Sequence, residues 1–322
     1  EVFSRLRVVQ VSQESFGEIE PQGVIRWAKD RSPFHLVSDV TIPPETQLQI
    51  DSGVQVYVQP GVRLTIEGTL QILGQLNERV RFGPHPQAAP QDDPLLPGLQ
   101  LGPPKWGGIR IIDSLSPDNK VLYTDIVHAQ PTDNKGSIGV IRSECFIDHC
   151  TFSGTHYRMV YGRNCSLTVQ YCNFPDMFAE DENPVAIGLD NVAEQLKVES
   201  ANFPEIANDP RFVGGFPVGG HFRVYHNDFY GNKGHNDVLD ADSGRWGISP
   251  VLDCRYNHFH GPVGDEHMDL GGDAYVAFNI FENVSKDEFT SDRGYANAIS
   301  TGDRGSGTTV VVAGNVFRKV EH

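Results

Sequence analysis

The sequence predicts an all-β fold, a solenoid of short strands whose coils stack along one axis. Three observations predict it. Short strand-like segments dominate the 322 residues, a tripeptide that ends in phenylalanine recurs at intervals of 22 residues or more, and 33 Gly and 21 Pro supply frequent turns. A coil of about 22 residues cannot bury its own apolar face, so a core forms only when each coil lies on the next.

The N-terminal part of the chain alternates apolar and polar residues, as half-buried strands do. Two helix-like segments interrupt this pattern, at 20–30 and 191–199. The open end of a solenoid is a sheet edge that needs a cover, so we predict a cap in residues 1–37 and the stacked coils in 38–322. The strands expected before residue 83 are 8–11, 40–42, 48–50, 54–58, 64–66, 70–73 and 80–82.

Three segments lack the strand pattern and are predicted to be long loops that leave the stack. The first, 83–105, holds seven prolines and one basic residue, and strand patterning resumes directly after it. The other two are 191–220 and 284–296. The last residues follow a strand with no closing element, so we expect the chain to be cut from a longer protein with other domains.

The repeated tripeptide carries the register of the stack. Its phenylalanines are predicted to lie in one column with strands ~4.8 Å apart. The asparagine that precedes most of them at a coil corner can exchange amide hydrogen bonds with its neighbours. These residues are therefore assigned to structure, not chemistry. The tripeptides are 150–152, 172–174, 201–203, 227–229, 257–259, 279–281 and 315–317.

Five cysteines leave at least one thiol unpaired in a monomer. The preferred interpretation is that they are small buried apolar residues. A disulfide between Cys150 and Cys172 is the alternative.

The net charge of −16 argues against a nucleic-acid partner. No run of 18 apolar residues occurs, so no membrane insertion is expected. The excess of acidic over basic residues is concentrated in residues 176–292, which hold 22 acidic and 7 basic residues.

Residues 39–82, followed by Trp106 to Ile109, resemble the opening of secreted right-handed parallel β-helix proteins, the fold of pectate lyases and polygalacturonases. The later repeats resemble the β-helix regions of bacterial surface proteins that carry spore-coat-kinase-like and lamin-tail domains. The resemblance implies a right-handed coil, an extracellular or cell-surface location and a polysaccharide or other glycan as partner. The polygalacturonase motifs are absent, and Gly234 to Asn236 is only a partial echo of them, so no catalytic role is carried over.

Overlaying residues 236–241 on 265–270 and then on 296–301 predicts stacked carboxylates. Asp237 would lie beside Glu266 and Asn297, and Asp240 beside Asp269 and Ser300, unless the register slips by one residue. Carboxylates one strand spacing apart repel each other unless a proton or a cation intervenes.

Three outcomes follow from that proximity. Calcium could be held by oxygens of Asp237, Asp240, Glu266 and Asp269. One carboxyl could keep its proton and act as the acid in glycoside cleavage, with Asp240 and Asp269 as the catalytic pair. The side chains could instead extend into water as a solvated face.

A lyase would need a base and a cation beside a uronate. His235 and His267 are the candidate bases, with Lys286 as another, and Arg293 is a candidate clamp for the substrate carboxylate, as are Arg245 and Arg255. His258 and His260 would point to the same side of a strand, a pattern compatible with a metal.

The sequence thus favours an extracellular carbohydrate-directed β-helix, either a polysaccharide lyase or a glycoside hydrolase. The alternative is a non-catalytic, calcium-stabilised surface or adhesion module of a larger secreted protein.

Overall fold

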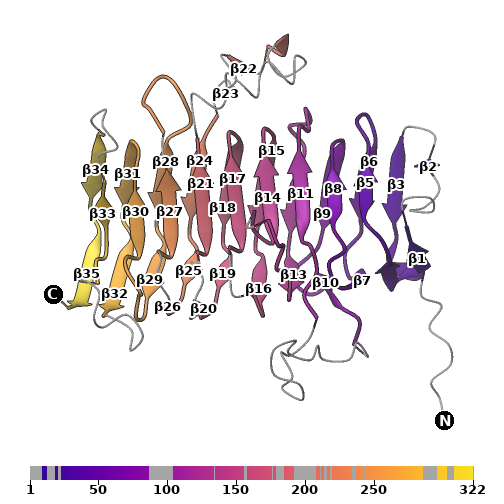
Figure 1. Cartoon of the computed structure of the whole chain (residues 1–322), viewed down its shortest axis with the longest axis horizontal. Coiled ribbons are helices and arrows are strands. Elements are labelled where there is room, and N and C mark those ends of the chain that lie inside the picture. The colour runs from indigo at the N-terminus through magenta and orange to yellow at the C-terminus, as the bar shows by residue number, and fades with distance from the viewer. Residues whose placement is uncertain are drawn as a thin grey trace.

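The computed structural model shows a right-handed parallel β-helix (Figure 1). Its described residues are 9–12, 19–20, 23–86, 104–133, 135–155, 158–175, 177–178, 185–191, 208–210, 212–213, 216–217, 220–233, 237–242, 244–285, 296–302 and 308–321.

Three sheets of 11, 11 and 9 strands, named here A, B and C, run along the stack, and all their strands but the antiparallel β2 pair in parallel. Each complete coil contributes one strand to each sheet. Sheet A contains β1 (Val9–Val11), β4 (Phe34–Leu36), β7 (Gln55–Val58), β10 (Val80–Pro84), β13 (Thr124–Val127), β16 (Thr151–Ser153), β19 (Asn173–Phe174), β25 (Asp228–Phe229), β29 (His258–His260), β32 (Ile280–Val284) and β35 (Val316–Val320).

Sheet B contains β2 (Ile19–Glu20), β3 (Val24–Trp27), β6 (Gln47–Ile50), β9 (Thr69–Leu73), β12 (Lys120–Leu122), β15 (Glu144–Asp148), β18 (Ser166–Gln170), β24 (Phe222–Tyr225), β28 (Leu252–Arg255), β31 (Ala274–Ala277) and β34 (Val310–Ala313). Sheet C contains β5 (Val40–Ile42), β8 (Leu64–Ile66), β11 (Ile109–Ile112), β14 (Ile138–Ile141), β17 (Val160–Arg163), β21 (Ile187–Asp190), β27 (Leu239–Asp242), β30 (Met268–Leu270) and β33 (Ser300–Thr301).

Two short pairs lie outside these sheets. β20 (Met177–Phe178) pairs in parallel with β26 (Asn232–Lys233), and β22 (Phe212–Val213) pairs antiparallel with β23 (Phe216–Pro217). The expected strands before residue 83 are confirmed, each to within two residues at either end.

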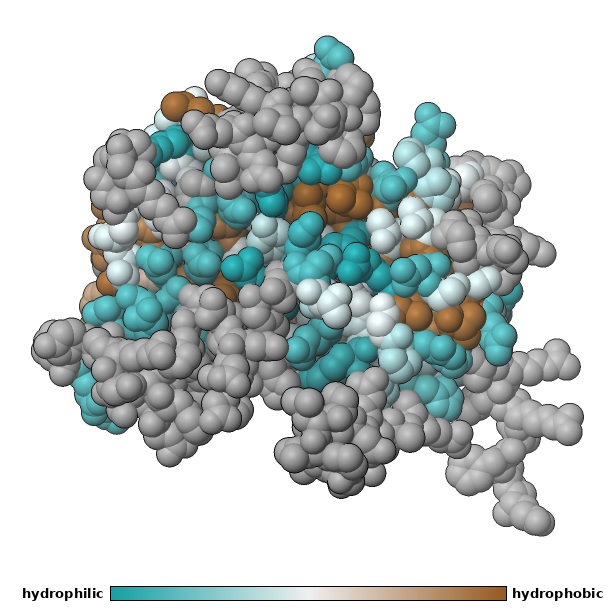
Figure 2. Space-filling model, viewed as in Figure 1, coloured by the Kyte–Doolittle hydropathy of each residue, from teal (hydrophilic) through white to brown (hydrophobic). Residues whose placement is uncertain are grey.

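The alternation of the sequence explains why the strands face as they do. In β6 and β7 every second residue is buried inside the coil and the residues between them are partly exposed. The inward residues of all three sheets join into one continuous apolar core. Figure 2 shows one side of the molecule, where hydrophilic side chains run along the middle between smaller apolar patches.

The helix predicted for 20–30 is wrong. Residues 24–27 form strand β3, because Ile25 and Trp27 are buried while Arg26 between them is exposed, a period of two. Only one turn of 3-10 helix follows, η1 (Lys29–Arg31). β3 and β4 already belong to the stack, and β2 pairs antiparallel along β3. Residues 192–199, the other expected helix, lie outside the described residues.

The phenylalanine column is confirmed along sheet A. Successive rings stack with centroids 4.5–5.2 Å apart, through Phe152, Phe174, Phe229, Phe259, Phe281 and Phe317. One predicted member is wrong, because β19 pairs directly with β25 and Phe174 stacks on Phe229. No coil therefore intervenes for the tripeptide 201–203, and Phe203 itself lies outside the described residues.

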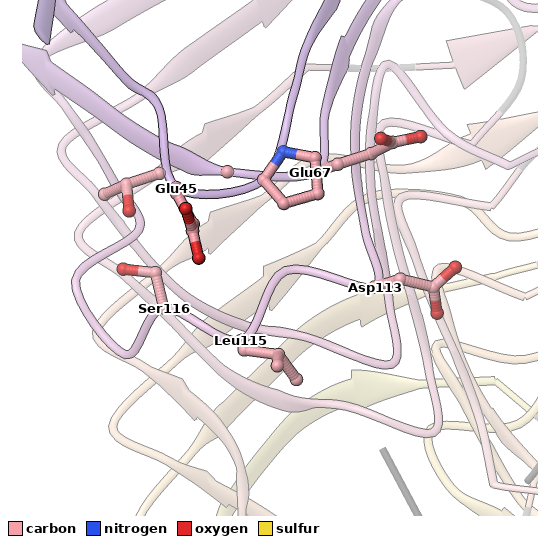
Figure 3. Close-up of a pocket in the computed structure, with 8 residues that line it drawn as sticks. Glu45, Glu67, Asp113, Leu115 and Ser116 are labelled. Carbon is pink, nitrogen blue, oxygen red and sulfur yellow. The ribbon is translucent and has the colours of Figure 1, made fainter. Parts of the chain in front are cut away.

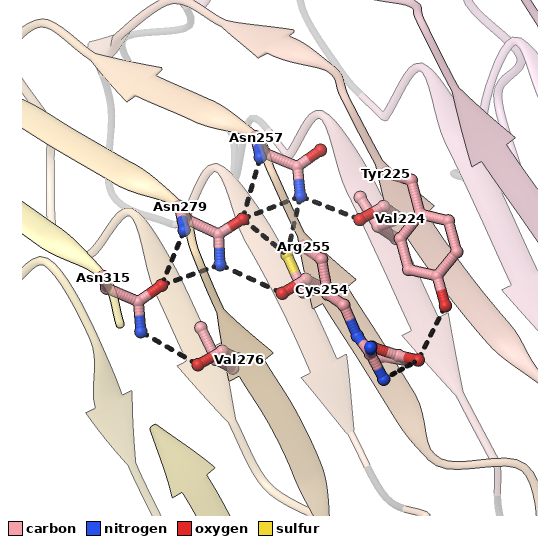
Figure 4. Close-up of polar contacts among 9 residues, drawn as sticks. Val224, Tyr225, Cys254, Arg255, Asn257, Val276, Asn279 and Asn315 are labelled. Carbon is pink, nitrogen blue, oxygen red and sulfur yellow. Dashed lines mark hydrogen bonds and ion pairs between the residues drawn. The ribbon is translucent and has the colours of Figure 1, made fainter. Parts of the chain in front are cut away.

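An asparagine ladder follows the same corner of the coil (Figure 4). The side-chain oxygen of Asn257 accepts hydrogen bonds from the backbone and side-chain nitrogens of Asn227, and Asn279 accepts from Asn257 in the same way. Asn315 continues the pattern, and Asn227 accepts from the backbone of Cys172. The predicted amide exchange is confirmed.

The three predicted loops lie largely outside the described residues. The sheets continue across them: β10 pairs directly with β13, β21 with β27, and β32 with β35. All five cysteines are buried with free thiols, as the preferred interpretation expects, so Cys150 and Cys172 form no disulfide.

Candidate functional site

The outer surface of sheet C brings the predicted carboxylates together. Asp240 in β27 lies opposite Asp269 in β30, and Asp269 lies opposite Ser300 in β33, so the predicted register is confirmed. Both aspartates are partly buried and alternate with inward apolar residues. The sequence places them outward because Leu239, Ala241, Met268 and Leu270 fill the core.

A second pair lies where the chain enters the same two strands. Asp237 is 4% exposed and shares a side-chain hydrogen bond with Glu266. Glu266 pairs with Asn297 of the following coil, whose amide nitrogen lies 3.2 Å from Glu266 Oε1. The predicted order Asp237, Glu266, Asn297 is therefore confirmed as well.

Asp237 is the most perturbed carboxyl of this group. Burial, the hydrogen bond and charge of Glu266, and the charges of Asp269 and Asp240 together raise the pKa of Asp237 to about 10. The raised pKa favours a proton on Asp237 in its hydrogen bond with Glu266.

The oxygen atoms are close enough for one ligand to touch several of them. One oxygen each from Asp237, Asp240 and Asp269 lies within 4.8 Å of the others, and Asp237, Asp265 and Glu266 form a second such group. We name Asp237, Asp240, Glu266 and Asp269 the carboxylate cluster. Its all-oxygen donor set is the kind that Ca²⁺ prefers.

A cation that the sequence analysis missed faces the cluster. Arg158 Nη2 lies 3.6 Å from Asp240 Oδ2, and its guanidinium carbon lies 5.3 Å from the centroid of the Tyr161 ring. Gly188, between Tyr161 and Asp240 in the column, makes room: a Cβ there would meet Arg158 Nε at 3.2 Å. Arg158 precedes β17, and only the pairing of β17, β21 and β27 shows which carboxylate it reaches.

A neighbouring column carries further acids. Asp190 in β21 lies opposite Arg163 in β17 and Asp242 in β27. The Tyr161 hydroxyl donates to Asp190 Oδ2 at 3.3 Å. Burial raises the pKa of Asp190, Arg163 opposes that rise, and Asp242 adds to it. Sheet C thus presents four aspartates on three adjacent strands, β21, β27 and β30, with Arg158 and Arg163 on their N-terminal side.

Among the described residues, the predicted base His267 and the predicted clamp Arg255 lie away from the carboxylate cluster. His267 is fully buried, with its ring 6.0 Å from Phe259 and 6.2 Å from Phe281, and burial lowers its pKa to about 3. Its ring packs against the phenylalanine column and not among the outward carboxylates. Arg255 lies on sheet B, paired with Asp253. His235, Lys286 and Arg293 lie outside the described residues.

A separate pocket of about 610 Å³ lies at the corner between sheets C and B, three coils from the N-terminal end (Figure 3). Three successive turns line it, and they contribute Glu45, Glu67 and Asp113 together with Leu115 and Ser116. Asp113 is already paired, because Arg142 donates to both of its oxygens at 2.5 and 2.8 Å. The described part of the pocket holds no cluster comparable to the carboxylate cluster.

The fold and this surface define a parallel β-helix with a proton-bearing carboxylate cluster on one outer sheet. No protein-family model, curated protein or solved structure matches the chain. Within the described residues, no helix is both long and apolar enough to cross a bilayer.

Proposed function

We propose that the protein is an extracellular glycoside hydrolase that acts at the carboxylate cluster on sheet C. One observation carries this proposal: one oxygen each from Asp237, Asp240 and Asp269 lies within 4.8 Å of the others, and burial together with the neighbouring carboxylates raises the pKa of Asp237, which favours a proton there. Hydrolysis of a glycosidic bond needs a proton donor and a carboxylate on the same substrate.

The proposed roles rest on the following contacts. Arg158 beside Asp240 stabilises the negative charge of that carboxylate, which makes Asp240 the nucleophile for the anomeric carbon. Asp237 supplies the proton that the leaving-group oxygen takes up. Asp269, opposite Asp240, helps hold that proton on Asp237. The short separation of the oxygens corresponds to a retaining mechanism, since carboxyl groups ~5 Å apart leave no room for an intervening water.

Charge and exposure favour a neutral glycan. Four aspartates on β21, β27 and β30 would repel a uronate polymer. Trp246, in the turn after β27, is 50% exposed and offers a face on which a sugar ring can stack. A lyase has less support, because His267 is buried in the core and the carboxylate cluster would face a uronate with like charge.

The test is a panel of neutral and acidic glycans, with product measured as reducing ends and as absorbance of unsaturated uronates. We expect reducing ends without unsaturated products. Asp240→Asn and Asp237→Asn should each lower kcat by 10²-fold or more, the usual contribution of such a group. Asp253→Asn on sheet B is the matched control and should leave activity unchanged. Unsaturated products would replace the hydrolase with a lyase, and no product on any glycan would remove the enzymatic proposal.

The second candidate is a calcium-stabilised surface module without catalysis, and the all-oxygen donor set favours it. Asp237, Asp240, Glu266 and Asp269 would hold the ion. Ca²⁺ would have to displace the proton of Asp237, so binding should release about one proton per ion at pH 7. Added Ca²⁺ should raise the melting temperature by several degrees and a chelator should reverse it. An unchanged melting temperature without proton release would show that the cluster does not bind Ca²⁺, whatever the result of the glycan panel.

A further inference from the structure

A different constellation of side chains lies on the outer surface of sheet A. His258 and His260 project from β29 with ring centroids 4.5 Å apart, which confirms that they point to the same side of the strand. Asp228 lies directly opposite His258 in β25, and Glu282 lies opposite His260 in β32. Two imidazoles on one strand are thus flanked by a carboxylate on each neighbouring strand.

We propose that Asp228, His258 and His260 form a binding site for a borderline transition-metal ion such as Zn²⁺. One donor atom from each of the three residues lies within 4.8 Å of the others. Asp228 Oδ1 lies 3.1 Å from His260 Nε2 and 3.6 Å from His258 Nδ1. Tetrahedral zinc with bonds of about 2.0–2.1 Å separates its ligand atoms by about 3.3 Å. The two measured separations bracket that value.

Glu282 supplies the outer contact that metal-bound histidines commonly have. Its Oε2 lies 3.5 Å from His258 Nε2, on the other side of the ring from Asp228. A hydrogen bond from Nε2 to this carboxylate would leave the lone pair on Nδ1, the nitrogen that faces Asp228 and His260. Glu282 is therefore a positioning residue that sets the tautomer of His258.

The donor set defines the class of ion. Two imidazole nitrogens with one carboxylate suit Zn²⁺, Ni²⁺ or Cu²⁺ and are poor ligands for Ca²⁺ or Mg²⁺. Three protein ligands leave a fourth position open for water or an exogenous ligand. The His258 and His260 side chains are 39% and 22% exposed, so an ion can enter from solvent. This site is on sheet A and shares no residue with the carboxylate cluster.

The test is Zn²⁺ titration of the whole chain by calorimetry, with Co²⁺ as a spectroscopic probe whose strong visible absorption reports tetrahedral nitrogen and oxygen ligation. We expect one Zn²⁺ per chain at this site. His260→Gln should weaken binding by at least tenfold and abolish the Co²⁺ bands. Glu282→Gln should weaken it by about 10-fold while keeping the bands, as expected for an outer contact.

Two controls separate this site from other surface groups. His149→Gln removes a histidine that pairs with a single carboxylate, Asp148, and should leave Zn²⁺ affinity unchanged. Asp269→Asn alters the carboxylate cluster and should also leave it unchanged, so the outcome does not depend on the proposed hydrolase. Melting curves verify that each variant folds. Absence of stoichiometric Zn²⁺ binding, or undiminished binding by His260→Gln, would overturn the proposal.

Discussion

The ring of Phe259 lies on the ring of Phe229 with centroids 4.5 Å apart and planes 7° from parallel. These residues are thirty positions apart in the chain, yet they are neighbours because β25 pairs with β29. The same pairing of successive coils sets the carboxylate cluster on sheet C and the histidines on sheet A. The stacking of successive coils that aligns these rings therefore also determines which side chains meet in each proposed site.

Phe259→Ala should lower the free energy of unfolding by about 3–5 kcal/mol, because a fully buried ring is lost between two others. Phe317→Ala, at the C-terminal member of the described column, is the control. Its ring is 49% exposed, so the loss should be about 1 kcal/mol. Urea unfolding of both variants measures the difference, and equal losses would contradict the column as a source of stability.

Asn257→Ala should destabilise the fold by about 3 kcal/mol or more. It leaves two buried nitrogens of Asn227 without their acceptor, and each such loss costs about 1–3 kcal/mol. Asn315→Ala removes the same contacts from Asn279, but there water can replace the amide because Asn315 is only partly buried. We expect a smaller fall in Tm for Asn315→Ala than for Asn257→Ala. An equal fall in Tm for the two variants would argue against the amide exchange as a source of stability.

Asp237 should make the fold less stable as pH rises. Its pKa is about 10 when folded and 3.8 in its unperturbed state, so between these values the folded chain holds a proton that the unfolded chain releases. Stability should therefore fall with pH by up to ~1.4 kcal/mol per unit from this group. Asp237→Asn keeps a donor for Glu266 and should flatten the decline. Urea titrations at pH 5–8 with chelator present measure it, with Asp253→Asn for comparison.

His267 should have the opposite effect at acid pH. Its folded pKa is about 3 against an unperturbed 6.5, so the unfolded chain takes up a proton first as pH falls. The stability from the neutral buried ring is complete above pH 6.5 and is lost progressively toward pH 3. His267→Gln should weaken this acid dependence, whereas His149→Gln should not. If His267→Gln and His149→Gln lost stability equally as the pH falls, a group other than His267 would cause the acid dependence.

The five thiols should be inert in the native protein. Burial raises the pKa of Cys145, Cys165, Cys172 and Cys254, and all five cysteines are inaccessible. A colourimetric thiol reagent at pH 8 should label none before denaturant is added and five afterwards. Rapid labelling of one thiol in native buffer would show a local opening of the core.

Much of the fold follows from period-two patterning and from the repeated Phe and Asn, because those residues must stack to be buried or bonded. The order of Asp240 and Asp269 could be predicted for the same reason. The cation that faces the carboxylate cluster, Arg158, could not be predicted from the sequence. Arg158 reaches Asp240 only because β21 pairs with β27 across a long insertion, and sequence spacing does not show which coils meet there.

The errors have related causes. The tripeptide 201–203 lies outside the described residues, yet β19 and β25, which precede and follow it in the chain, pair directly, so a tripeptide match alone cannot show that a segment is a coil. Residues 24–27 fall within an expected helix, yet their Val, Ile and Trp favour a strand, and Ile25 and Trp27 are buried at alternate positions. His267 carries a reactive side chain but occupies an inward position, which a register uncertain by one residue cannot distinguish from an outward one.

The asparagine ladder has a direction. From Cys172 through Asn227, Asn257 and Asn279 to Asn315, the side-chain oxygen of the later residue accepts from the earlier coil. Each asparagine's amide nitrogen also donates back to a backbone carbonyl of the preceding coil. During synthesis on the ribosome, every newly emerged corner would therefore wait for its acceptor until the next turn of nascent chain arrives. The last coil of a growing stack would therefore hold amide donors whose side-chain acceptor is supplied only when the next coil folds onto it.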